Sequence, residues 1–386
     1  MHPTQDLIDF IDASPSAYHA AAEVARRLGF EQRDSYAAPG GHVLVRDGAV
    51  IAWWVPENPA SFRIVGSHTD SPGYMLAPEP ESVREGMHVA LVEKYGGPIA
   101  ASFFDRDLTI AGRIVLADGS ERLVDTGAVA RIPRLATHLD RAEQADLRVT
   151  PVVAAPVMDL VAQTAGVDRN DILGHELITV DTQRGDVFGE YLCARRMDNL
   201  TSVYASLVAF QNAAPDAEEV LVMSAFNHEE IGSQTTSGAA GPLLDTVLSR
   251  IADGLGQDIR DMKERSIVVS ADAAHAVHPN YPEKHDLTKP VLNGGPVTKV
   301  SATKRYASDA STIAVWERAC RVAGVPSQTY VGRSGSTIGP ITATRTGIPT
   351  VDVGVPLLSM HSAREMAGTL DQQWLAAALE QFYLDN

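Results

Sequence analysis

Several short, largely apolar runs in this chain are each followed closely by polar residues. The runs cover residues 62–65, 220–223 and 267–269, and the polar residues after them include His68, Asp70, Glu229, Glu230 and Asp272. Continuous apolar runs of this length are typical of strands buried on both faces of a parallel sheet. Because the carboxyl ends of parallel strands meet in one crevice, we expect these polar side chains to lie together there.

Helical and hairpin patterns surround these strands. Ser14 followed by Pro15 predicts the start of a helix, and Gly29 predicts its end. A strand–turn–strand pattern centred on Asp47-Gly48 predicts a β-hairpin, because this dipeptide favours a tight turn. Further helices are expected at residues 198–208, 242–251 and 309–325, and further strands at 266–270 and 350–353.

The pattern changes in the middle of the chain. Residues 74–190 are rich in proline and glycine and contain short strand patterns, such as 113–117 and 121–124 joined by Asp118-Gly119. One helical pattern is found there, near residues 134–147. We therefore predict an α/β protein with a three-layer domain and a mixed, largely parallel sheet, made of residues 1–73 and 191–386. Residues 74–190 are predicted to form a β-rich domain inserted into it.

Composition narrows the class of protein. The 386 residues suffice for two domains, and 45% apolar with 21% charged residues is ordinary for a soluble globular chain. No apolar run approaches the roughly 20 residues that span a bilayer, and the N-terminal residues lack the basic start and apolar core of a signal peptide. The two cysteines, Cys193 and Cys320, suit the cytoplasm and cannot form a tetrahedral thiolate zinc site.

Charge excludes some partners. The chain has 32 basic and 49 acidic residues, a net charge of −17 with histidine neutral, so nucleic acid and anionic membrane surfaces are not expected partners. The adjacent carboxylates of Glu229 and Glu230 repel each other at the end of a buried strand, and a cation is expected to compensate them. A solvated acidic turn is the alternative for such a pair alone. Histidine and carboxylate ligands gathered in one crevice favour a zinc or manganese site.

An ordered series of short motifs extends this prediction. The series is Gly66-Ser67-His68-Thr69-Asp70, Met197-Asp198-Asn199, His228-Glu229-Glu230-Ile231-Gly232, Ser270-Ala271-Asp272 and Met360-His361-Ser362. It resembles the dinuclear zinc aminopeptidases, and most closely the aspartyl aminopeptidase family. The resemblance extends to residues 270–282, 295–308, 336–340 and 360–366, and so covers most of the chain.

The resemblance implies a set of metal ligands. His68 and Asp272 would bind one zinc ion, Glu230 and His361 the other, and Asp198 would bridge the two. A bridging carboxylate can hold two ions about 3.5–4 Å apart, and manganese or cobalt are possible substitutes. The excess positive charge left by three carboxylates around two dications would stabilise a bridging hydroxide.

It also implies catalytic residues outside the ligand set. Glu229 would be the general base that activates the metal-bridging water, and Asp70 would orient the His68 imidazole. His138 would reach the active site of a neighbouring subunit and stabilise the transition state.

Substrate and assembly follow from the same resemblance. It implies hydrolysis of peptides with an N-terminal Asp or Glu, with Lys299 paired to the acidic side chain and Tyr306 beside it. A buried ammonium group facing a carboxylate is suited to an acidic substrate of an acidic protein. Residues 74–190 would be a dimerisation domain within a homo-oligomer, a dodecamer of tetrahedral shape.

Other interpretations stay open on the residues alone. A dinuclear metallophosphatase can use similar ligands, and a carboxypeptidase or amidohydrolase can share the fold. A non-catalytic peptide-binding scaffold is a further alternative, although such a protein has no need of the base Glu229. Spacing does not exclude His228, His275 or His278 as ligands.

Overall fold

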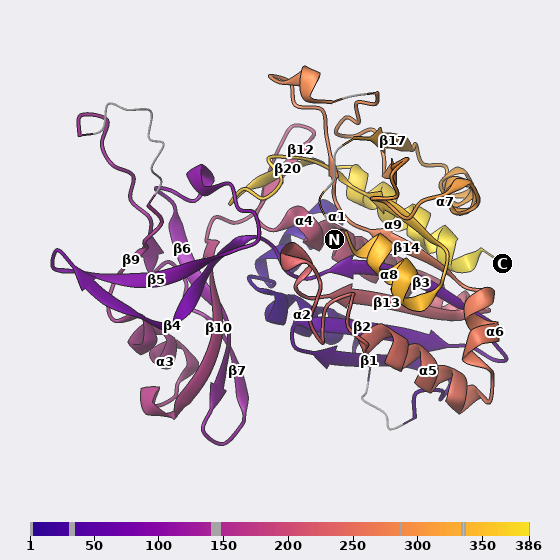
Figure 1. The fold of residues 1–386 in the computed structure, drawn as a ribbon, viewed down its shortest axis with the longest axis horizontal. Coiled ribbons are helices and arrows are strands. Elements are labelled where there is room, and N and C mark those ends of the chain that lie inside the picture. The colour runs from indigo at the N-terminus through magenta and orange to yellow at the C-terminus, as the bar shows by residue number, and fades with distance from the viewer. Residues whose placement is uncertain are drawn as a thin grey trace.

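The chain forms a large lobe and a smaller lobe made mostly of strands (Figure 1). The computed structural model describes residues 3–30, 35–139, 148–285, 287–332, 335 and 337–385. Both labelled chain ends lie in the large lobe, so the chain leaves this lobe to build the smaller one and then returns to it. In the described parts of the chain, no helix has the length and apolar character needed to cross a membrane.

An eight-stranded sheet runs through the large lobe. Its order is β1 (Gly40–Arg46), β2 (Ala49–Val55), β13 (Val220–Phe226), β3 (Phe62–His68), β14 (Ile267–Ala271), β18 (Thr350–Gly354), β16 (Val297–Val300) and β17 (Gln328–Val331). The central strands β13, β3, β14 and β18 are parallel neighbours, whereas β1–β2, β2–β13 and β16–β18 pair antiparallel. The predicted mixed, largely parallel sheet is confirmed.

Helices cover both faces of this sheet and complete three layers. One apolar core joins the sheet to α1 (Pro3–Asp12), α2 (Ala17–Leu28), α4 (Met197–Ala213), α7 (Ala310–Ala323) and α9 (Asp371–Leu384). A second core, on the opposite face, joins it to α5 (Leu243–Leu255), α6 (Ile259–Glu264) and α8 (Ile338–Thr346). The central strands β13 and β14 are buried along their whole length, which explains their continuous apolar runs.

Most of the local predictions for the first 55 residues are correct. Asp47 and Gly48 both have positive φ angles, 47° and 76°, as a tight hairpin turn requires, so the β1–β2 hairpin is confirmed. Gly29 ends α2 in the left-handed conformation. The predicted N-cap at Ser14 is wrong, because α2 begins two residues later and the Ser16 hydroxyl accepts the bond from the His19 amide.

The smaller lobe is a closed antiparallel barrel. Its strands are β10 (Ile172–Asp181), β4 (Gly73–Arg84), β5 (Met87–Tyr95), β9 (Val152–Val153), β8 (Ala130–Arg131), β6 (Asp107–Leu116) and β7 (Glu121–Asp125), and β10 also pairs with β6 to close the ring. Helix α3 (Val157–Ala165) packs on its apolar core. The helix predicted near residues 134–147 is absent from 134–139, and residues 140–147 lie outside the described residues.

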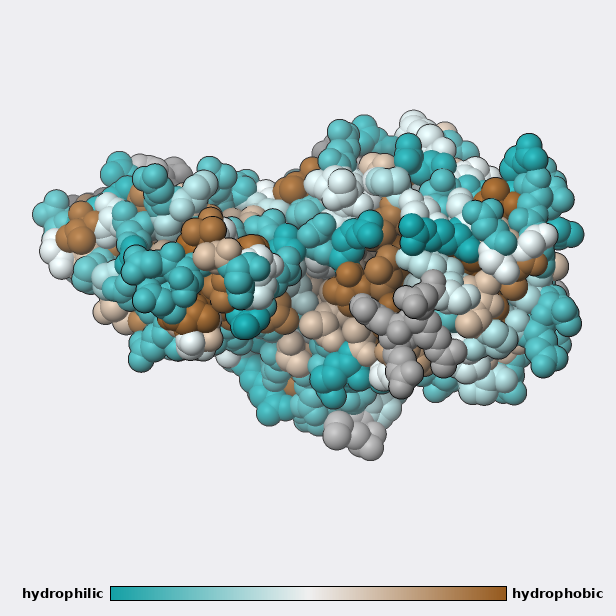
Figure 2. Space-filling model, turned by 90° about the horizontal axis from the view of Figure 1, so that it is seen from below, coloured by the Kyte–Doolittle hydropathy of each residue, from teal (hydrophilic) through white to brown (hydrophobic). Residues whose placement is uncertain are grey.

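A third sheet, of five strands, packs against α1, α4 and α9 of the large lobe. Its order is β11 (Asp186–Phe188), β12 (Tyr191–Ala194), β20 (Glu365–Gly368), β19 (Pro356–Leu358) and β15 (Ala274–His275). Short 3₁₀ turns complete the described elements: η1 (Ala100–Ser102), η2 (Arg169–Asp171), η3 (Ala214–Asp216), η4 (Glu229–Ile231) and η5 (Pro282–Lys284). The face of the molecule shown in Figure 2 is mostly hydrophilic and carries apolar patches on both lobes.

Candidate metal centre

Three parallel strands of the large sheet bring their polar ends to one edge. His68 is the last residue of β3, and its register partner on β13 is Phe226. Three residues beyond Phe226, the 3₁₀ turn η4 begins with Glu229 and Glu230. Asp272 directly follows β14, the other neighbour of β3. The crevice expected at the carboxyl ends of these strands therefore contains all four of these side chains.

Asp198 and His361 reach the same place from connections outside the large sheet. Asp198 lies at the start of α4, after Arg196, which has a left-handed backbone conformation. His361 lies in the loop between β19 and β20 and also has a positive φ angle, 69°. A left-handed conformation is uncommon for residues with a side chain, and it often marks positions where the surrounding structure imposes the backbone shape.

The Asp198 carboxylate lies between the two histidines. Its Oδ1 atom is 3.3 Å from His68 Nε2, and its Oδ2 atom is 3.4 Å from His361 Nε2. On one side, Asp272 Oδ1 also lies 3.3 Å from His68 Nε2. On the other, Glu230 Oε2 lies 3.4 Å from His361 Nε2. The five side chains therefore form two groups of three that share Asp198.

This arrangement fits divalent metal ions. The Asp198 Oδ1 and Glu230 Oε1 atoms are buried and have no hydrogen-bond partner among the described residues, which is costly unless a cation compensates them. His68, Asp198 and Glu230 can each offer a ligand atom such that these atoms lie within 4.8 Å of one another. Neutral imidazole nitrogen and carboxylate oxygen are ligands that zinc accepts.

Glu229 lies beside these groups in a cleft of about 260 Å³. The cleft is lined by Gly97, Asp198, Glu229, Glu230, Gly232, Asp272, Ala273, His275, Lys299, Tyr306, Gly335, Thr337, Met360 and His361. Burial raises the pKa of Glu229 to about 8, and the carboxylates of Asp272, Asp70 and Asp198 add to this effect while His68 opposes it. In the metal-free chain, Glu229 is therefore a carboxyl group that holds its proton near neutral pH.

Asp70 makes hydrogen bonds to residues of both ligand groups. Its backbone oxygen lies 3.1 Å from His68 Nδ1, and its Oδ1 atom lies 3.4 Å from the same nitrogen. The two carboxylate oxygens also accept the backbone N–H groups of Glu229 and Glu230, each at 3.1 Å. Asp70 therefore contacts one histidine and the backbone of both glutamates.

Glu365 is a supporting residue that the sequence analysis did not identify. Its buried carboxylate accepts the His361 backbone N–H at 2.7 Å and the Asp198 backbone N–H at 2.8 Å. Burial raises the pKa of Glu365 to about 8, with the Asp198 charge next in importance. The available signal was an acidic residue four positions after His361, in the motif at residues 360–366.

Lys299 lies in the cleft wall, and its ammonium group has partners within the chain. Lys299 Nζ donates to the backbone oxygens of Asp272 and Ala273, at 2.8 and 3.2 Å, and to Asp272 Oδ2 at 3.1 Å. Burial lowers the pKa of Lys299, but the charges of Asp272, Tyr306 and Asp352 together outweigh this effect and raise it. The Tyr306 ring centroid is 5.3 Å from Lys299 Nζ. In this structure Lys299 thus holds the Asp272 carboxylate.

The remaining histidines are distributed around the molecule. His138 is exposed in a turn of the smaller lobe, not on the helix that was expected. His275 lines the cleft and packs edge-on against Tyr330. His228 Nδ1 lies 2.9 Å from the Thr235 hydroxyl, and His278 Nδ1 accepts the Asn280 backbone N–H. Of His228, His275 and His278, only His275 lines the described part of the cleft.

Fold and site together define a metal-dependent hydrolase, and comparison with known proteins identifies the family. A family model described as Aminopeptidase I zinc metalloprotease (M18) matches residues 10–383. Proteins named probable M18 family aminopeptidase 2, from Streptomyces coelicolor and Pseudomonas aeruginosa, are 44% and 41% identical to this chain. These alignments cover 98% and 99% of this chain and 97% and 98% of the relatives.

Solved structures of similar fold support the same family. A complex of Ape4 and Nbr1 contains a chain with a TM-score of 0.93 and 31% identity, covering 99% of this chain and 85% of that one. Yeast aminopeptidase 1 gives a TM-score of 0.88 with 28% identity, over 98% of this chain and 96% of its own. The chain therefore belongs to the M18 family of zinc aminopeptidases, and it is a metalloaminopeptidase.

Proposed function

We propose that this protein removes Asp or Glu from the N-terminus of peptides, with two zinc ions per chain and Glu229 as the general base. The observation that carries the proposal is the Asp198 carboxylate between two ligand groups, beside the buried carboxyl group of Glu229. When bound, zinc ions lower the pKa of a water molecule and polarise the peptide carbonyl.

Glu229 moves the proton in this proposal. It takes a proton from the attacking water and returns it to the amine that leaves. With two dications bound beside it, the Glu229 carboxyl group would be ionised, which is the form that accepts a proton. Asp70 keeps the His68 imidazole in the orientation that presents Nε2 to the ligand group.

Specificity for acidic residues rests on Lys299 and Tyr306. Among the described residues that line the cleft, Lys299 is the one Lys or Arg side chain, so it is the cation placed to attract a substrate carboxylate. The hydrogen bonds of Lys299 to Asp272 and Ala273 allow a different role, in which Lys299 orients the Asp272 ligand and does not bind the substrate side chain. The two roles predict different kinetics.

A panel of aminoacyl chromophore substrates on zinc-loaded protein tests the proposal. We expect strong turnover of Asp and Glu derivatives and weak turnover of Ala, Leu and Lys derivatives. In Lys299→Met, the loss of a charge-assisted hydrogen bond is worth roughly 1.5–3 kcal/mol, so activity on Asp substrates should fall tens-fold more than on Ala substrates. Equal losses would assign Lys299 to orienting Asp272. Hydrolysis of a phosphate ester with no aminopeptidase activity would instead favour a metallophosphatase.

The number of ions is tested separately. Five proposed ligands exceed what one four-coordinate zinc ion takes from a protein, and two groups sharing Asp198 match two ions. Elemental analysis of active protein should give two zinc ions per chain, with manganese or cobalt able to replace them after chelation. One ion per chain at full activity would contradict this part of the proposal.

We propose further that the chain assembles into a homo-oligomer through the domain inserted at residues 74–190. The barrel exposes large apolar side chains, among them Val83, Met87 and Leu173, and a similar structure is that of an S. cerevisiae mApe1 dodecamer. The exposure of His138 supports a role in the site of a neighbouring subunit.

We also propose that the protein works in the cytoplasm, because the described chain has two free cysteines. The expected partners are peptides, without nucleic acid or membrane.

A further inference from the structure

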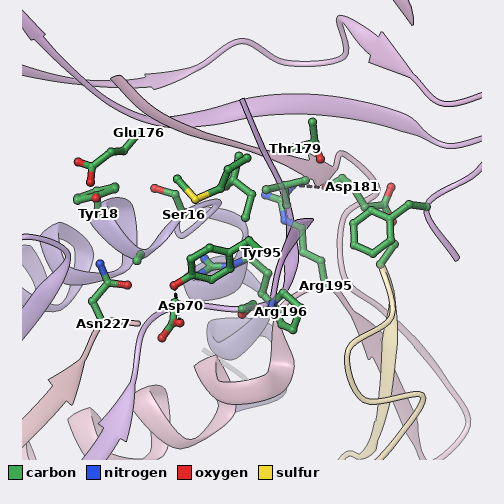
Figure 3. Close-up of a pocket in the computed structure, with 18 of the residues that line it drawn as sticks. Ser16, Tyr18, Asp70, Tyr95, Glu176, Thr179, Asp181, Arg195, Arg196 and Asn227 are labelled. Atoms are coloured by element: carbon green, nitrogen blue, oxygen red, sulfur yellow. Dashed lines mark hydrogen bonds between the residues drawn. The ribbon is translucent and has the colours of Figure 1, made fainter. Parts of the chain in front are cut away.

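Strand β5 of the barrel ends at Tyr95, whose side chain reaches the large lobe. The Tyr95 hydroxyl donates a hydrogen bond to Asp70 Oδ2 at 2.8 Å, and both side chains are buried. Figure 3 shows this bond in the cavity between the lobes, with the Tyr95 hydroxyl group pointing at the Asp70 carboxylate. A residue of the inserted segment is therefore bonded to a carboxylate that lies behind the ligand groups.

Asp70, which accepts this hydrogen bond, also contacts three residues of the metal centre. The Asp70 carboxylate accepts the backbone N–H groups of Glu229 and Glu230, and it lies 3.4 Å from His68 Nδ1. The end torsion of an aspartate side chain is broad unless hydrogen bonds restrict it. The Tyr95 hydroxyl supplies such a restriction on Oδ2, the oxygen that also accepts from Glu230. A rotation of this carboxylate would disturb His68 and the turn that carries both glutamates.

The residues after Tyr95 contact the other ligand group. The Gly97 backbone oxygen lies 3.1 Å from His361 Nδ1, a contact that leaves Nε2 to face Asp198 and Glu230. The Ile99 N–H donates to the His361 backbone oxygen at 2.9 Å. Gly96 has a φ angle of 66°, and a Cβ atom there would lie 3.1 Å from Glu230 Cβ, so both the backbone conformation and the close approach favour glycine. The end of β5 thus contacts the surroundings of both groups.

We propose that Tyr95 is a positioning residue of this metallopeptidase: it sets the Asp70 carboxylate, and through it His68 and the turn that carries Glu229. The barrel lobe then contributes directly to the geometry of catalysis, in addition to any role in assembly. This inference rests on the proposed function. Outer hydrogen-bond partners of metal ligands commonly contribute 10–100-fold to metal affinity or activity.

The first test compares two buried tyrosines. Tyr95→Phe removes only the hydroxyl group that bonds Asp70. Tyr383→Phe is the matched control, because the buried Tyr383 hydroxyl donates to the Val222 backbone oxygen, away from the ligand groups. We expect kcat of Tyr95→Phe to fall about tenfold with KM changed less than about twofold, and Tyr383→Phe to match the unaltered protein in both. Equal kinetics for all three proteins would overturn the inference.

The second test measures zinc affinity, which requires no turnover. Competition with a chromogenic chelator gives the zinc Kd of the unaltered protein, Tyr95→Phe, Asp70→Ala and the double variant. If Tyr95 acts through Asp70, Tyr95→Phe weakens zinc binding about tenfold alone and less than about twofold when Asp70 is already absent. The same loss in both backgrounds overturns the inference. Absence of aminopeptidase activity in the unaltered protein would instead remove the proposed function.

Discussion

The adjacent carboxyl groups of Glu229 and Glu230 face different partners. Both line the cleft, but Glu230 Oε2 lies 3.4 Å from His361 Nε2 within one ligand group, whereas Glu229 lies outside both groups, near the charged groups of His68 and Asp272. A left-handed residue, His228, precedes them and starts the tight 3₁₀ turn that separates their directions. We therefore assign them different chemistry, although they are chemically identical neighbours in the sequence.

Isosteric substitutions separate these two assignments. Glu229→Gln should keep its zinc but lose at least about 10²-fold in kcat, the lower range for general acid–base catalysis. Glu230→Gln should weaken zinc binding, because it removes a charged ligand. Kinetics and elemental analysis of the two variants, purified side by side, check this. Near-normal turnover in Glu229→Gln would exclude Glu229 as the base.

The raised pKa of Glu229 leads to a prediction of how pH affects the stability of the metal-free protein. Its pKa is about 8 in the folded chain and 4.5 ordinarily, so the folded state binds the proton more tightly than the unfolded state. The free energy of unfolding must then fall as pH rises between these values. With chelator present, Glu229→Gln should be more stable than the unaltered protein at pH 8, and the difference should shrink at pH 5. Urea denaturation at both pH values measures it; a pH-independent difference would contradict this sign.

At the scale of elements, Glu365 ties β20 to the start of α4. One carboxylate accepts the backbone N–H groups of Asp198 and His361, which lie far apart in the sequence. In Glu365→Gln, an N–H₂ group must face one of these N–H groups, so one bond is lost. We expect zinc affinity to fall by about 10–100-fold, as for other outer partners of metal ligands.

A second buried carboxylate provides the control for Glu365. Asp371, the first residue of α9, accepts the backbone N–H groups of Asn293 and Gly295. None of these three residues lines the described part of the cleft. Asp371→Asn should therefore lower stability without changing zinc affinity. A similar loss of zinc affinity in both variants would show that Glu365 acts only through general stability.

At the scale of the whole molecule, the exposed His138 leads to a prediction about assembly. His138 is exposed on the smaller lobe and does not line the described part of the cleft of its own chain, and we propose that it acts in a neighbouring subunit. His138→Ala and Glu229→Gln should each be nearly inactive alone. When the two are co-expressed, some sites in mixed oligomers combine Glu229 of one chain with His138 of another, and activity should return.

Differently tagged chains show whether mixed oligomers have formed. Recovery of activity only in the mixed fraction is the expected result. If His138 acts within its own chain, every site keeps one of the two lesions, and mixed oligomers stay inactive. That outcome would refute the shared site and leave the assignment of ligands unchanged.

Much of the large lobe could be predicted from the sequence, because its signals are local. Continuous apolar runs marked β13 and β14, since strands buried on both faces need apolar side chains at every position. Asp47-Gly48 marked the hairpin turn, since both residues tolerate positive φ angles. Side chains at the ends of parallel strands were expected in one crevice, and β3, β13 and β14 lie as neighbours there.

Only the tertiary structure decided the contacts between distant segments. Tyr95 and Glu365 carry no local mark of their roles, because each depends on which backbone or carboxylate lies opposite after folding. The partners of Lys299 were equally hidden, since its ammonium group could face either substrate or Asp272. Periodicity and turn chemistry report on neighbours along the chain. A hydrogen bond between segments that are far apart in sequence depends instead on how the layers pack, and a single sequence carries no local record of that packing.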